Sequence, residues 1–214
     1  GTDILASLEF YQKVYGVIPL NEINVTEIPY LHGEAFPGLV HLSWFNYQGT
    51  SHDKSGELMR AHEVAHQWWG IGVDFEDYHD QWISEGFAEF SALYFVQVGF
   101  GIEDYFDILD NWKKDILGNR KYIIGQGQKS GPIWLGYRTN SSETEGDYST
   151  IVYKKGAWVL HMLRNMLIDL KTMDEDRFKG LMKEFFSSYY GKKANIKDFK
   201  KLADKYAGAD LEWF

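Results

Sequence analysis

The spacing of apolar positions changes along the chain, and this change predicts an N-terminal part that contains strands and a later part that is mostly helical. Residues 3–15 have apolar side chains at helical spacing, with Leu5 and Tyr11 among them, and are followed by a glycine and a proline, so a helix is expected there. Residues 23–28 alternate, and residues 39–45 form a short apolar run, which is typical of strands. We predict that these two segments pair in a small N-terminal sheet.

From about residue 55 the apolar positions repeat with a helical period, and the stripe is clearest over 102–117. Residues 118–147 contain six glycines and one proline, which predicts a long, mostly irregular connection. The expected fold class is therefore α+β, with a small sheet followed by a mostly helical part. The helices that we predict are 56–69, 80–98, 102–117, 148–170, 174–190 and 195–206.

Composition excludes several classes of function. A length of 214 residues favours one domain that can fold without a disulfide or a metal. The absence of cysteine excludes thiolate metal sites and cysteine nucleophiles, and a formal net charge of −9 argues against a broad nucleic-acid surface. There is no apolar run long enough to span a membrane, while the compartment stays open.

The segment His62-Glu63-Val64-Ala65-His66 carries the candidate chemistry. Positions i and i+4 of a helix share one face, so both imidazoles can approach a single metal ion. Glu63, beside the first histidine, can take a proton from a water that the metal activates. The alternative is a helix with two histidines by chance, in a chain that has seven.

A zinc ion bound by two histidines needs a third protein ligand while it keeps a position for water. Glu85 follows His66 after a gap of 18 residues, within a segment of helical periodicity. A helix there can pack back against the first and turn Glu85 toward both histidines. A single glutamate on a helix is more often an ordinary surface residue. Glu85 is interpreted as a metal ligand because its segment occurs together with the histidine segment.

Together these segments resemble the gluzincin metallopeptidases of the aminopeptidase N family, which also contains the bifunctional leukotriene hydrolase. The resemblance implies a thermolysin-like catalytic domain over residues 1–214, excised from a longer multidomain protein whose other domains flank it. It also implies peptide substrates and one Zn²⁺ ion held by His62, His66 and Glu85. The matching stretches are His62-Glu63-Val64-Ala65-His66-Gln67-Trp68-Trp69-Gly70, Ile83-Ser84-Glu85-Gly86-Phe87-Ala88 and Tyr153-Lys154-Lys155-Gly156.

The same resemblance implies roles for other residues. Glu63 matches the general base, and Tyr153 matches the phenol that donates a hydrogen bond to the oxyanion. Tyr148 lies where some family members have a second active-site tyrosine, although either tyrosine of a chain with 14 can simply pack. Separately, Glu89 lies one helical turn after Glu85, and we expect it to orient a metal-bound histidine, the alternative being a surface or capping residue.

One departure from the family bears on specificity. Aminopeptidases of this family have a Gly-x-Met-Glu-Asn strand whose glutamate binds the α-amine of the substrate. Aligned on Gly38, this chain has Ala35 at that position, and Glu34 is one residue away, which on a strand turns a side chain to the other face. The remaining histidines lack ligand spacing and are expected at the surface or in the core: His32, His41, His52, His79 and His161.

Three hypotheses on function stay open at this point. The first is a metallo-aminopeptidase that removes N-terminal residues from peptides. The second is a zinc endopeptidase or another hydrolase without the amine anchor. The third is a non-catalytic peptide-binding domain of the same fold.

Overall fold

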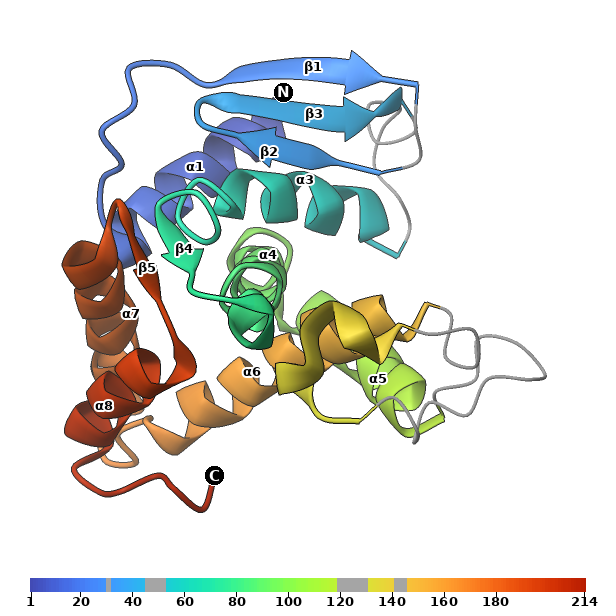
Figure 1. Ribbon diagram of the computed structural model, residues 1–214. Coiled ribbons are helices and arrows are strands. Elements are labelled where there is room, and N and C mark those ends of the chain that lie inside the picture. The colour runs from blue at the N-terminus through green and yellow to red at the C-terminus, as the bar shows by residue number, and fades with distance from the viewer. Residues whose placement is uncertain (30–31, 45–52, 119–130, 141–145) are drawn as a thin grey trace.

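In the computed structural model of the chain, a small sheet lies over two helices at the N-terminal end (Figure 1). Strand β1 (Asn24–Ile28) runs parallel to β3 (Leu39–Ser43), which confirms the predicted pairing. A third strand, β2 (Glu34–Phe36), runs antiparallel to β3 at the sheet edge, and its three residues are too few for an alternating pattern to predict. The structure describes residues 1–29, 32–44, 53–118, 131–140 and 146–214.

Most of the remaining described chain is helical, so a small sheet followed by a mostly helical part is confirmed. The predictions for 3–15, 102–117, 174–190 and 195–206 agree within two residues at each end with α1 (Thr2–Tyr15), α5 (Ile102–Gly118), α7 (Asp176–Tyr189) and α8 (Ile196–Ala207). The predicted face of α1 is wrong at Leu5, which is 63% exposed. Tyr11 of the predicted stripe is completely buried, as expected, and Ile4 faces the core in place of Leu5.

Helix α3 (Ser55–Ala65) ends four residues before the predicted limit of 69. The chain turns directly after it, and Gly70 adopts a φ of +99°, which a glycine tolerates without steric cost. The predicted helix 80–98 is divided at Ser84 into a 3₁₀ segment, η1 (Tyr78–Ile83), and α4 (Glu85–Gly99). Glu85 therefore stands at the start of a helix rather than within one.

The predicted helix 148–170 begins as a π-helical segment, η4 (Ser149–Lys155), and continues as α6 (Gly156–Met166). Within the predicted, mostly irregular connection, residues 133–139 form a 3₁₀ segment, η3 (Ile133–Thr139), which the pattern does not predict. Residues 119–130 and 141–145 of that connection lie outside the described residues.

Two short strands that the pattern does not predict join distant parts of the chain. Strand β4 (Val73–Phe75) pairs in parallel with β5 (Lys192–Ala194). The backbone N–H of Gly191 also donates to the carbonyl of Gly72 at 2.7 Å. These bonds attach the C-terminal helices to the turn that follows α3.

Helix α4 lies at the centre of the molecule, between α3 and α6 (Figure 1). Phe87, Phe90 and Leu93 are completely buried, as are Trp68 and Trp69 of the turn after α3. The Trp69 indole N–H donates to the Ser91 hydroxyl at 3.1 Å, so the ring is buried with its polar atom satisfied. None of the helices in the described ranges combines the length and the apolarity that a membrane span requires.

Two glycines allow α4 to approach the η4–α6 junction closely. A Cβ atom placed on Gly86 would lie 3.1 Å from the Cα of Gly156 and 3.1 Å from the carbonyl oxygen of Val152. Such distances are shorter than nine in ten real Cβ contacts, and both neighbours are backbone atoms that cannot rotate away. This contact brings Glu85, adjacent to Gly86, near Tyr153 of η4.

We expect Gly86→Ala to destabilise the fold by about 1–3 kcal/mol, because the added methyl group overpacks a backbone contact. Gly118→Ala is the matched control, since this helical glycine has no atom within 4 Å of a placed Cβ. The control is expected to be neutral or stabilising by about 0.4–1 kcal/mol. Urea unfolding of both variants measures the difference, and equal free energies of unfolding would contradict the packing argument.

Candidate metal centre

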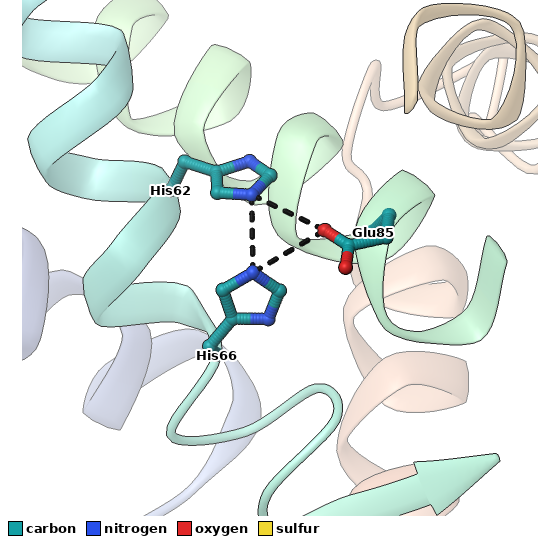
Figure 2. Close-up of side chains that lie close together, drawn as sticks. All are labelled: His62, His66 and Glu85. Atoms are coloured by element: carbon teal, nitrogen blue, oxygen red, sulfur yellow. Dashed lines mark hydrogen bonds and ion pairs between the residues drawn. The ribbon is translucent and has the colours of Figure 1, made fainter. Parts of the chain in front are cut away.

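Three side chains from two helices converge on one point (Figure 2). His62 and His66 project from the C-terminal end of α3, one helical turn apart, and Glu85 projects from the first turn of α4. Glu85 Oε2 lies 3.5 Å from His62 Nε2 and 3.4 Å from His66 Nε2. The two Nε2 atoms are 3.1 Å apart. Within the described ranges, this is the only group of three or more metal-ligating side chains that converges in this way.

The donor atoms of this group fit a metal ion such as zinc. Glu85 Oε2 is buried and makes no hydrogen bond, although two ring nitrogens lie near it. Two histidines and one glutamate form a ligand set that catalytic zinc sites use, with one position left for water. An ion between the three atoms would satisfy the buried oxygen and both facing nitrogens.

The Nδ1 atom of each histidine lies beside a hydrogen-bond acceptor, and the Nε2 atom therefore faces the centre of the site. His62 Nδ1 lies 2.8 Å from Glu89 Oε2, and His66 Nδ1 lies 2.9 Å from the carbonyl oxygen of Trp69. An Nδ1–H that donates to such an acceptor fixes the ring orientation and leaves Nε2 free to bind a metal. The contact predicted between Glu89 and a candidate histidine is therefore present.

Burial and the neighbouring charged groups shift the pKa values of the side chains in this cluster. Burial alone would raise the pKa of Glu85, but the imidazoles of His62 and His66 outweigh it and hold that pKa well below its usual range. Burial alone would lower the pKa of His62, yet Glu85 and Glu89 raise it well above the usual value. Opposite charges thus stabilise one another across the site.

The other two predicted residues, Glu63 and Tyr153, line the same cavity as the three candidate ligands. This cavity has a volume of about 660 Å³. Burial raises the pKa of Glu63, despite the opposing effect of the two imidazoles. The Tyr153 ring stacks on His62 with centroids 5.5 Å apart, and burial together with Glu85 raises the pKa of its phenol. Tyr148 packs edge-on against Tyr153 and is not among the cavity-lining residues.

The cavity wall on the side of the sheet is formed by β2 and the residues before it. Glu34 and Ala35 both line this wall. The Glu34 carboxylate is half-exposed and lies 3.3 Å from His32 Nε2 and 3.9 Å from His41 Nδ1. Ala35 pairs with the buried Val40 and offers no charge.

Four glutamates line the cavity, and neither lysine nor arginine is among its described lining residues. These glutamates come from three parts of the chain, so the acidic character does not arise from one local cluster. The four are Glu34, Glu63, Glu85 and Glu89.

Among the described histidines without ligand spacing, none belongs to the converging group, although His32 lines the same cavity. His79 Nδ1 lies 2.9 Å from Asp77, and His161 Nδ1 lies 2.6 Å from the Tyr105 hydroxyl. Burial lowers the pKa of His161 to about 4. His52 lies outside the described residues.

Two contacts at the centre are not predicted from the sequence. One is the Trp69 carbonyl that binds His66, and the other is the backbone of Gly33, which lies against Glu63. A Cβ atom placed on Gly33 would lie 2.3 Å from Glu63 Oε1. The first contact uses a backbone carbonyl, which any residue type supplies, and a lone glycine at position 33 does not by itself indicate a close approach.

Comparison with known proteins supports the interpretation of this centre. The family model described as Peptidase family M1 domain matches residues 43–214. Endoplasmic reticulum aminopeptidase 1 of Mus musculus is 27% identical over 205 residues, which cover 89% of this chain and 20% of that protein. Endoplasmic reticulum aminopeptidase 2 of Homo sapiens is 26% identical over 97% of this chain and 21% of its own length. The chain thus spans about a fifth of these relatives.

Solved structures share the fold. An M1 zinc metallopeptidase from Deinococcus radiodurans has a TM-score of 0.70 at 20% identity, covering 99% of this chain and 42% of that one. Native yeast LTA4 hydrolase has a TM-score of 0.75 at 19% identity, covering 99% of this chain and 32% of that one.

We expect Glu89→Ala to lower zinc affinity about 10- to 100-fold, because His62 loses the acceptor that orients it. Glu85→Ala is expected to lower the affinity further, since it removes a candidate ligand. Titration against a zinc-binding chelator measures both, with Glu103→Ala, an exposed glutamate on α5, as the control. If Glu85→Ala retained zinc as the unchanged protein does, the proposed ligand set would be wrong.

Proposed function

This chain belongs to peptidase family M1, and from that membership we propose that it is a zinc-dependent peptidase whose favoured reaction removes N-terminal residues from peptides. The observation that carries the proposal is one cavity lined by His62, His66, Glu85, Glu63 and Tyr153. We propose further that residues 1–214 act as one thermolysin-like catalytic domain, and that other domains of a longer protein flank it. The small share of each relative that the chain covers supports this.

His62, His66 and Glu85 would hold one zinc ion. When bound, such an ion supplies a Lewis acid that polarises the scissile carbonyl and lowers the pKa of a nearby water.

Glu63 is the proposed general base. It follows His62 on α3, and its carboxylate lines the cavity with the backbone of Gly33 packed against it. Its pKa is raised by burial, so a proton that it takes from the attacking water can be passed on to the leaving amine. The packing against Gly33 restricts where that carboxylate can turn.

Tyr153 is the proposed hydrogen-bond donor to the oxyanion. Its raised pKa keeps the phenol protonated at neutral pH, so the O–H remains available to donate. The π-helical segment η4 presents this side chain to the cavity, and such segments often occur at functional sites. One preorganised donor of this kind typically contributes about 3–4 kcal/mol to transition-state stabilisation.

An endopeptidase is the second candidate, and a specific observation favours it. Ala35 provides no carboxylate for a free α-amine, and the Glu34 carboxylate lies beside His32 and His41. An endopeptidase substrate extends past the cavity and has no free α-amine there. Such a substrate would be at no disadvantage, because Ala35 offers no charged contact in any case.

We expect Glu63→Gln to lower kcat for a short peptide about 100- to 10,000-fold, because the amide cannot accept the proton. Zinc content should stay equal to that of the unchanged protein, since Glu63 is not a proposed ligand. Steady-state kinetics and metal analysis of the same samples check both statements. Hydrolysis at the unchanged rate would exclude Glu63 as the base.

Blocking the amino terminus of a substrate separates the two candidate specificities. For an aminopeptidase, we expect the N-acetylated form of a short peptide to be hydrolysed at least about tenfold more slowly than the free form. Chromatography with mass spectrometry identifies the products. Equal rates with internal cleavage would favour the endopeptidase, and zinc binding without hydrolysis of either form would favour a non-catalytic peptide-binding domain.

A further inference from the structure

A buried glutamine joins the metal centre to the cavity wall formed by β2. Gln67 directly follows His66 and is 2% exposed. Its side-chain Nε2 donates to the carbonyl oxygen of Phe36 at 2.9 Å, and its Oε1 accepts from the backbone N–H of Gly38 at 3.0 Å. One amide therefore binds both sides of the turn that connects β2 to β3.

This turn needs support from outside the hairpin. Pro37 precedes Gly38, whose φ is +70°, as in a type II turn. Type II turns do not match the twist of strands joined by two residues, so the turn alone holds the hairpin weakly. The backbone N–H of Asn24 donates to the Gly38 carbonyl at 2.8 Å, which fixes the turn to β1. Gln67 fixes it to the chain that carries His66.

The strand held in this way lines the cavity. Glu34, Ala35 and Phe36 all line it, together with the candidate metal ligands. Strand β2 has three residues and, among the described strands, pairs only with β3, so its own ladder restrains it little. Gln67 does not line the cavity itself.

We propose that Gln67 is a positioning residue that sets the separation between the β2 wall and the metal centre, and thereby the affinity for peptide. This inference rests on the proposed peptidase function. Gln67 acts through β2, so its loss should affect peptide binding more than the chemical step.

The test compares Gln67→Met, which keeps the size of the side chain but not its hydrogen bonds, with Gln81→Met. Gln81 is a matched control because its Oε1 also accepts a backbone N–H, from Tyr137 at 2.7 Å, and it does not line the cavity. We expect Gln67→Met to raise KM for a short peptide roughly tenfold, with kcat changed less than about threefold and zinc content unchanged. Gln81→Met should leave KM within about twofold of the unchanged value. Gln67→Asn keeps the amide but shortens its reach, and its KM is expected to lie between those of Gln67→Met and the unchanged protein, which preserves the test if Gln67→Met does not fold.

Hydrogen–deuterium exchange of the amides of residues 33–40 supplies a readout that needs no catalysis. Exchange should be faster in Gln67→Met and unchanged in Gln81→Met. An unchanged KM, an unchanged exchange rate, or a fall in kcat that follows loss of zinc would each overturn the inference. A zinc-loaded, unsubstituted protein that hydrolyses no peptide would instead overturn the proposed function, and the exchange rates would still decide whether Gln67 holds β2.

Discussion

The arrangement of this protein depends on holding two imidazole nitrogens and one carboxylate oxygen within 3.5 Å of one another in a partly buried site. A buried oxygen without a hydrogen bond is costly, so the packing around it must be rigid enough to maintain the arrangement. Helix α3 supplies two of the groups one turn apart, and the packing of α4 against α3 supplies the third. The acceptors on His62 and His66 then fix the ring orientations.

Packing and chemistry are coupled at the start of α4. Glu85 is the first residue of this helix, and Gly86, the second, is in contact with the η4–α6 junction. The same junction presents Tyr153 to the cavity that Glu85 also lines. The aromatic core around α4 therefore does more than stabilise the fold, because it determines how far the candidate ligand and the candidate oxyanion donor lie from each other.

The sequence predicts the parts of this molecule that follow a strong local rule. Two histidines at i and i+4 must share a helix face. Glu89, one turn after Glu85, must lie on the same face of its helix as Glu85. The division at Ser84 and the π-helical segment Ser149–Lys155 depend on contacts between distant segments, so a continuous helical pattern conceals them. The three-residue strands β2, β4 and β5 are too short to leave a period, although β2 forms a wall of the cavity.

The acidic lining of the cavity has a consequence for recognition. Four glutamates surround a space of about 660 Å³, and neither lysine nor arginine is among its described lining residues. Low-dielectric walls concentrate the field of such groups, so a cation is attracted by the cavity as a whole rather than by a single side chain. An attraction distributed in this way weakens as ionic strength rises, whereas a buried pairwise contact is largely shielded from salt. Long-range electrostatic steering can thus bring a cationic group to this centre even though Ala35 offers it no charged partner.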